Sequence, residues 1–342
     1  MIEKIKNELK SENYNFLKIN EHLGDNIILL GLGGSYSYGT NIQSSDIDIR
    51  GIALNTKKEI LLSEDFEQVL DEPTDTTIYS FNKMVTLLSN VNPNTIELLG
   101  LKSDHYLYLS SIGKELLDNK KMFLSKKAVK SFGGCANQQL YRLNQKAAHK
   151  MSQSALEKHI YKTITMMQDD FCKTYATFNN EDFIKLYIDE AVQEGYNTEI
   201  FMDVQLTHYP LRDYCSMWNE LKNTVSSYGK IGKRNKRVLE HGKIAKHSMH
   251  LIRLYMMCLD ILEKEEINTY RVEEHDLLMD IRNGKYLDEN SSPIPEFHEM
   301  VKDFENRLEY AKENTSLPEE PDYKRINEFK AYVNERIVRG DI

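Results

Sequence analysis

Two short groups of residues near the N-terminus have the types and spacing to bind an anion and cations. Gly33, Gly34 and Ser35 follow the apolar run "NIILLGLG", and a short spacer leads from them to Asp46 and Asp48 in "SDIDIRGIAL". A helix that begins directly after glycines presents unpaired backbone N–H groups and the positive end of its dipole to an anion. On its own, such a corner is more often just a tight strand-to-helix turn, so its interpretation depends on the acids.

The two aspartates are predicted to lie on one face of a strand. Asp46, Asp48 and Arg50 alternate with Ile47 and Ile49, and residues i and i+2 of a strand point to the same side, roughly 6.6 Å apart. Carboxylates so placed repel each other unless cations lie between them, and Mg²⁺ prefers such hard oxygen ligands. Two ions about 3.5–4 Å apart can stabilise the attacking and leaving oxygens of an in-line phosphoryl displacement. The alternative is a solvated edge strand with an acidic face.

The elements that must position these residues are predicted to form a small mixed sheet with helices packed on it. Strand patterns occur in the two runs named above and in the β-branched segment "DTTIYSF", and the helix-like segments "NKMVTLLSN" and "NPNTIELLG" follow. After about residue 110 the pattern becomes helical. We therefore predict an α+β fold with a sheet domain over residues 1–110 and a mainly helical domain over 111–342. A β-hairpin near 183–206 is possible within the second, although "YIDEAVQE" is equally compatible with a helix.

The longest predicted helix lies in "KRVLEHGKIAKHSMHLIRLYMMCLDILEKEEI". Its apolar residues recur at helical spacing and predict one buried face. That face is formed by Ile244, Leu251, Leu254, Cys258 and Ile261.

Composition and charge exclude several classes of protein. The chain has 342 residues, 40% of them hydrophobic, and a net charge of −9, which argues against a protein that coats nucleic acid non-specifically. No apolar run approaches the roughly 20 residues that span a bilayer, so no membrane association is expected. The N-terminus reads as an amphipathic helix and not as a signal peptide, and we expect a cytoplasmic location. Four cysteines without a Cys-x-x-Cys pair indicate neither a disulfide framework nor a zinc knuckle.

The combined pattern resembles the nucleotidyltransferases of the DNA polymerase beta superfamily. It consists of an apolar residue, Gly-Gly-Ser, a spacer and Asp-Ile-Asp-Ile. Together with "NPNTIELL", "KHSMHLIRL" and "LLMDIRNG", it resembles the polymerase-beta-like proteins of bacterial and phage RNA-repair operons from about Gly33 to Gly284. The resemblance implies transfer of a nucleoside monophosphate from an NTP to an acceptor hydroxyl, with Mg²⁺ or Mn²⁺ as cofactor and pyrophosphate as the leaving group.

The resemblance also assigns roles to residues. It implies that Gly34 and Ser35 hold the triphosphate and that Asp46 and Asp48 bind the metal ions. The superfamily usually adds a third catalytic, metal-binding carboxylate from a neighbouring strand, and we choose Asp75, which opens "DTTIYSF". If no third carboxylate faces the pair, a role in binding alone is favoured.

Other polar residues have two open interpretations each. Arg50, on the strand face of the aspartates, either offsets their charge or contacts a phosphate. His250 and Arg253 lie one turn apart on the long helix; the resemblance implies that they bind nucleotide or acceptor phosphates, and a structural core histidine is the alternative. Glu97 follows Asn94 by three residues, which predicts a capping box at a helix start.

A basic segment interrupts the acidic chain just before the long helix. It is either a solvated helix face or a contact for the backbone of an RNA or tRNA acceptor. Its cationic residues are Lys230, Lys233, Arg234, Lys236 and Arg237. We favour an RNA end as the acceptor. A protein hydroxyl as the acceptor, or a non-catalytic nucleotide sensor or scaffold, are the competing functions.

Overall fold

A computed structural model describes residues 2–133, 135–136, 165, 184–190, 192, 198–228, 241–288 and 292–342. The chain divides into two compact units. The first comprises Met1–Leu140, Ala245–Tyr286 and Pro295–Ile342, and the second comprises Tyr141–Ile244 and Leu287–Ile294. The first unit therefore joins the predicted sheet domain with parts of the predicted helical region.

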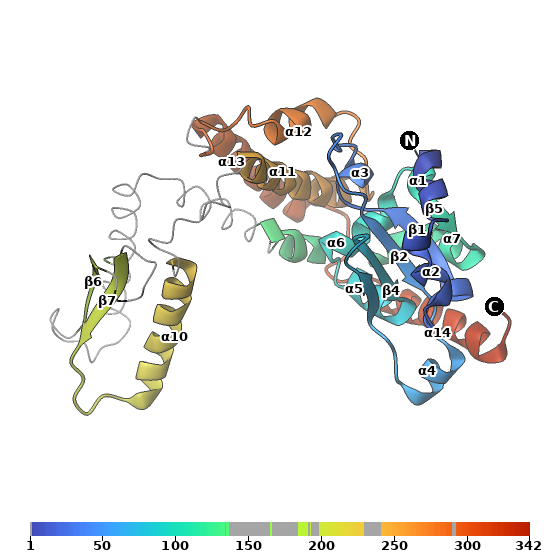
Figure 1. The fold of residues 1–342 in the computed structure, drawn as a ribbon, viewed down its shortest axis with the longest axis horizontal. Helices are drawn as coiled ribbons and strands as arrows, with labels where there is room; N and C mark the ends of the chain where they lie inside the picture. The colour runs from blue at the N-terminus through green and yellow to red at the C-terminus, as the bar shows by residue number, and fades with distance from the viewer. Residues whose placement is uncertain are drawn as a thin grey trace. The chain divides into compact units, whose positions relative to one another are not determined.

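A five-stranded mixed sheet forms the centre of the first unit (Figure 1). Its strand order is β3-β4-β2-β1-β5. The strands are β1 (Ile27–Leu32), β2 (Ile49–Ala53), β3 (Gln68–Asp71), β4 (Thr76–Ser80) and β5 (Tyr106–Leu109). β2 and β4 run parallel, and the other neighbours pair antiparallel. The sheet and the helices that follow it confirm the predicted α+β class.

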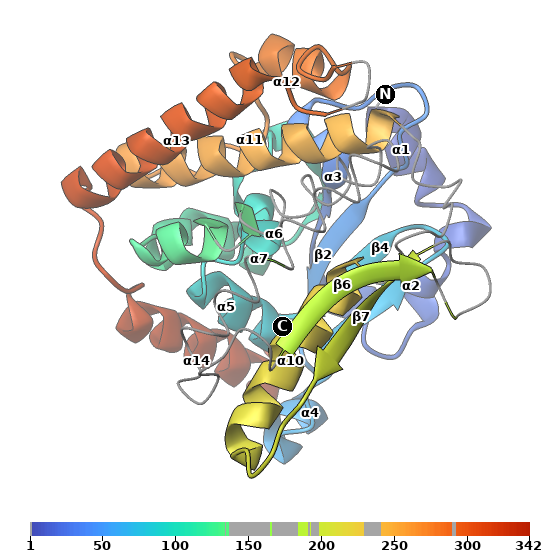
Figure 2. The ribbon, with the colours of Figure 1, turned by 90° about the vertical axis from the view of Figure 1, so that its left-hand side faces the viewer.

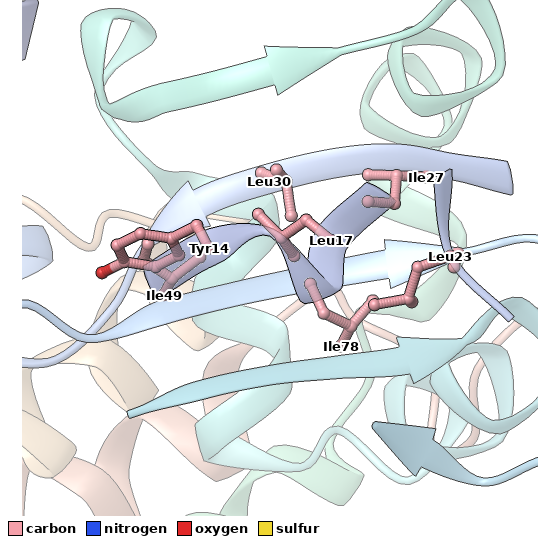
Figure 3. Close-up of a cluster of buried hydrophobic side chains, with 8 residues drawn as sticks. Tyr14, Leu17, Leu23, Ile27, Leu30, Ile49 and Ile78 are labelled. Carbon is pink, nitrogen blue, oxygen red and sulfur yellow. The ribbon is translucent and has the colours of Figure 1, made fainter. Parts of the chain in front are cut away.

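The N-terminal segment covers one face of this sheet. It contains α1 (Ile2–Glu8) and α2 (Phe16–Ile19). Tyr14 and Leu17 pack against a buried cluster that includes Leu30, Ile49 and Ile78 from three strands (Figure 3). Because neighbouring residues of a strand point to opposite faces, the residue after Ile49 points to the other face, away from this segment.

Helices of the first unit make up the rest of its core. The short ones are α3 (Gly34–Tyr38), α4 (Lys57–Leu62), α5 (Phe81–Ser89), α6 (Pro93–Ile96) and α7 (Ser111–Asp118). The longer ones are α11 (His241–Lys264), α12 (His275–Arg282), α13 (Pro295–Asn314) and α14 (Tyr323–Arg339). α14 packs on α4 and α5, and α13 runs alongside α11 (Figure 2).

Burial of α11 differs from the prediction. The sequence indicated a single apolar face, but nearly all residues from 248 to 262 are buried. The reason is that several elements enclose the helix. The ring of Tyr255 stacks on Phe304 of α13 with centroids 6.0 Å apart, while Arg253 pairs with Glu97, which lies outside α11 near the sheet. α11 is thus a central helix of the first unit.

The second unit contains a strand pair and a helix in its described part. β6 (Ile184–Glu190) and β7 (Thr198–Val204) pair antiparallel, in the range for which the sequence left a hairpin or a helix open. α10 (Leu211–Tyr228) follows. The five cations of the basic segment, between residues 230 and 237, lie outside the described residues.

No helix among the described residues combines the length and the apolarity needed to cross a membrane. The cytoplasmic location stays a prediction.

Candidate active site

The parallel pairing of β2 with β4 brings two acids together at one edge of the sheet. Ile49 lies opposite Thr76 in this register, so the residues just before them, Asp48 and Asp75, are neighbours. Their carboxyl groups share a hydrogen bond. Asp75 has a φ of 45°, a left-handed conformation that Asp tolerates better than most residues but that still carries strain. The structure thus places the acid chosen as third carboxylate directly beside Asp48.

The contact between the two acids changes how readily each ionises. Burial, and then the hydrogen bond and negative charge of Asp75, raise the pKa of Asp48 to about 7. The hydrogen bond from Asp48 lowers the pKa of Asp75 in turn. Two carboxyl groups in such contact cannot easily both be charged, and a nearby cation is what favours their ionised forms. The pair therefore has the charge and the oxygen ligands that suit a hard metal ion.

Arg50 lies against both acids. Its Nη2 is 3.2 Å from Oδ1 of Asp75 and 3.6 Å from Oδ1 of Asp48. Its Nη1 also donates hydrogen bonds to the carbonyl oxygens of Asp75, at 2.7 Å, and Ile49, at 3.0 Å. Arg50 is thus placed to offset the charge of the aspartates, and its contact with a phosphate stays a prediction.

The glycine corner touches the acid pair. Gly33 N donates to the carbonyl oxygen of Asp48 at 2.8 Å. Gly34 has a φ of +53°, and a Cβ added there would lie only 1.7 Å from Oδ2 of Asp48. Ser35, in the first turn of α3, is buried. Glycine at 34 is therefore required by the backbone and by the Asp48 carboxyl, before any ligand is considered.

Asp46 is placed differently from the prediction. β2 begins only at Ile49, and Asp46 is exposed in the loop before it, so strand alternation does not pair Asp46 with Asp48. The reason is that this loop forms its own turn, in which Ser45 N donates to the Ile42 carbonyl. Arg282 of α12 donates to Ser45 Oγ at 3.4 Å.

A preformed cluster of metal ligands is not found in the described part of the chain. Among these residues no group of three or more His, Cys, Asp and Glu side chains is arranged to hold a metal ion. Mg²⁺, however, is often bound by one or two carboxylates, with waters and substrate phosphates completing its shell. The two carboxyl groups of Asp48 and Asp75 fit that kind of site.

Glu97 does not form the predicted capping box. α6 begins after Asn92, whose side chain accepts a hydrogen bond from Asn94 N at 3.0 Å. Glu97 instead accepts hydrogen bonds from the hydroxyl of Tyr38, at 2.8 Å, and from Arg253 Nη1, at 3.1 Å. The local spacing of Asn94 and Glu97 favoured a cap. That spacing contains no information on a partner in a distant helix, and Arg253 is such a partner. Arg253 is thereby buried in an ion pair beside α3.

α11 also brings His250 and Lys246 into this region. Burial, with the neighbouring charges of Arg253 and Lys246, holds the pKa of His250 well below its usual range, so its imidazole is neutral at neutral pH. Lys246 is exposed, and its charge favours the ionised forms of Asp48 and Asp75. The proximity of Lys246 to the acids depends on tertiary packing, which local spacing does not specify.

Comparison with known protein families gives a match that covers the N-terminal half of the chain. The model of the RNA repair pathway DNA polymerase beta family matches residues 1–176. The matched part starts earlier than the resemblance seen in the motifs, which began at about Gly33, and it leaves out "KHSMHLIRL" and "LLMDIRNG". No curated protein and no solved structure matches the chain.

Proposed function

Because the chain belongs to the RNA repair pathway DNA polymerase beta family, we propose that it is a Mg²⁺-dependent nucleotidyltransferase. It transfers a nucleoside monophosphate from an NTP to an acceptor hydroxyl, and an RNA end is the acceptor we favour. The proposal is supported above all by one observation: the Asp48 and Asp75 carboxyl groups meet directly against the Gly33–Gly34 turn.

In the proposed reaction, the acceptor oxygen attacks the α-phosphorus of the NTP, and the bond to the bridging oxygen of the β-phosphate breaks to release pyrophosphate. Gly34 and Ser35 bind the triphosphate, and Asp48 and Asp75 would hold the metal ion. Asp46 would join them as a ligand by the family resemblance alone, since it is exposed in the loop before β2. Asp75 also takes up the proton that leaves the acceptor hydroxyl. The metal ion, Mg²⁺ or Mn²⁺, supplies charge stabilisation for the phosphoryl oxygens when bound. Catalysis is then mostly positioning and electrostatic stabilisation.

Cations around the acids have separate proposed roles. Arg50, in contact with Asp48 and Asp75, offsets their charge and keeps the carboxylates in place. Lys246 is exposed, and its charge favours the ionised form of Asp48, so it is suited to bind a phosphate of the NTP. His250 contacts the nucleotide or acceptor as a neutral group.

The function is tested by following the label of an NTP. The purified chain is incubated with Mg²⁺ and each α-labelled NTP in turn, and is offered RNA, tRNA or a lysate that contains protein only. We expect label on RNA or tRNA, with release of pyrophosphate, and no transfer when EDTA removes the metal ion. A reaction with γ-labelled NTP is the control, because this label should leave with pyrophosphate.

Other results of this experiment would support a different function. Label on protein alone would contradict an RNA acceptor and support transfer to a protein hydroxyl. NTP binding without any transfer to RNA, tRNA or protein would favour a nucleotide sensor or scaffold.

The basic segment is proposed to contact the backbone of the RNA or tRNA acceptor. Its cations make phosphate contacts that do not depend on base sequence. Charge reversal at Lys233, Arg234 and Arg237 should therefore weaken binding to RNAs of different sequence, and each lost contact should reduce the slope of log K against log salt by roughly 0.7 to 0.9. Titrations at several salt concentrations measure this slope.

NTP affinity is the control for the charge-reversed variant and should stay unchanged. RNA binding with an unaltered salt slope would show that the basic segment is only a solvated surface.

A further inference from the structure

The short helix α3 carries the glycine turn and is anchored at its other end by Tyr38. Tyr38 is 4% exposed, and the Arg253 guanidinium lies over its ring, 3.7 Å from the centroid. The Tyr38 hydroxyl and Arg253 Nη1 donate to the same oxygen, Oε2 of Glu97, at 2.8 and 3.1 Å. A five-residue helix has little stability of its own, so its position depends on contacts of this kind.

The backbone around this group is connected as well. Thr269 donates its hydroxyl to the Glu97 carbonyl oxygen at 2.7 Å, and Arg271 N donates to the Tyr38 carbonyl at 3.3 Å. The end of α3 is therefore held by side chains of α11 and by the chain segment that follows α11.

The side chain of Arg253 is poorly placed to bind a nucleotide. It is only 5% exposed, and the Glu97 side chain is 10% exposed. One face of the guanidinium covers the Tyr38 ring, and Nη1 is used by Glu97. Removing one partner of such a buried ion pair strongly destabilises the folded protein, because the other charge is left buried without compensation. The environment thus fits a structural contact within the protein.

We propose that Arg253 and Glu97 are positioning residues, which fix α3 through Tyr38 and thereby keep Gly34 against Asp48. Arg253 then contributes to the reaction without touching the NTP, contrary to the role implied by the resemblance. The expected effect on transfer rests on the proposed nucleotidyltransferase function, whereas the effect on α3 does not.

The first test is Tyr38→Phe, which removes only the hydroxyl and keeps the ring under the guanidinium. Loss of this buried hydrogen bond should increase the amide hydrogen exchange of residues 34–39 about five- to tenfold, with little change elsewhere. Tyr255→Phe is the matched control. It removes a hydroxyl that donates to Oε1 of Glu305 at 3.0 Å, also from a buried tyrosine, and should leave exchange in α3 unchanged.

The second test is Arg253→Lys, which preserves the charge but not the planar group over Tyr38. Under the proposal, exchange in α3 increases, and kcat for transfer falls at least about tenfold while KM for the NTP changes less than about threefold. A direct phosphate contact would give a different result, namely a higher KM with normal exchange in α3. That result would overturn the proposal.

Hydrogen exchange separates the two hypotheses, because it needs neither substrate nor activity. If the wild-type protein transfers no nucleotide, the proposed function fails, and exchange still tests the anchoring of α3. Unchanged exchange of residues 34–39 in both Tyr38→Phe and Arg253→Lys would overturn the inference even in an active enzyme.

Discussion

Asp48→Asn is expected to abolish nucleotide transfer while the protein stays folded. An amide lacks the negative charge that holds a divalent cation, and metal ions supply several kcal/mol of charge stabilisation in such reactions. We expect kcat to fall by about 10³-fold or more, which corresponds to about 4 kcal/mol. Stability should be kept, because the new side-chain amide can still donate a hydrogen bond to Asp75 and the repulsion between two carboxylates is removed. Label transfer and thermal unfolding measure the two effects.

Asp104→Asn is the matched control for this substitution. Asp104 is exposed, pairs with Lys102 at 3.1 Å and belongs to the same unit, so its amide variant should be fully active. Full activity of Asp48→Asn would contradict a metal-binding role. Asp46→Asn makes a further comparison, because Asp46 is exposed before β2 and its role is supported by the family resemblance alone.

Gly34→Ala should lower both the stability and the activity. The backbone at Gly34 has a φ of +53°, which costs about 1–2 kcal/mol for a residue with a Cβ. The added methyl group would also lie 1.7 Å from Oδ2 and 2.6 Å from Cγ of Asp48, so the carboxyl or the turn must move. We expect the free energy of unfolding to fall by about 2–4 kcal/mol and kcat to fall by about 10²-fold or more. Chemical denaturation and label transfer measure these changes.

Gly340→Ala is the control that separates the cost of a positive φ from the cost of the clash with Asp48. Gly340 has a φ of +78°, and nothing lies within 4 Å of a Cβ added there, so this variant carries only the backbone penalty and should be fully active. Equal stability losses in the two variants, with activity retained in Gly34→Ala, would show that the turn does not press on Asp48. The Cβ of Gly34→Ala already collides with the Asp48 carboxyl in the absence of a ligand. A loss of NTP affinity in this variant would therefore not by itself demonstrate a phosphate contact.

Local patterns in the sequence determined the main elements that carry the site. The apolar run before Gly33 predicts β1, and the β-branched run after Asp75 predicts β4. A glycine pair followed by a short helix is likewise a local feature, since it depends on the φ that one residue can adopt. The period-two alternation around Ile49 predicts a strand, although it places the start of β2 too early and so misplaces Asp46.

Only the tertiary structure decided which side chains meet. Asp75 contacts Asp48 because β2 and β4 pair in parallel with Ile49 opposite Thr76, and no local spacing specifies that register. The same holds for Glu97 and Arg253. The spacing around Glu97 suggested a cap, but its partner Arg253 lies 156 residues further along the chain, in α11. Their ion pair exists because α11 packs beside α3, and burial then makes each charge depend on the other. Residue types and spacing thus determined the chemistry that is available near Gly34 and Asp48, while strand register and helix packing decided which residues take part.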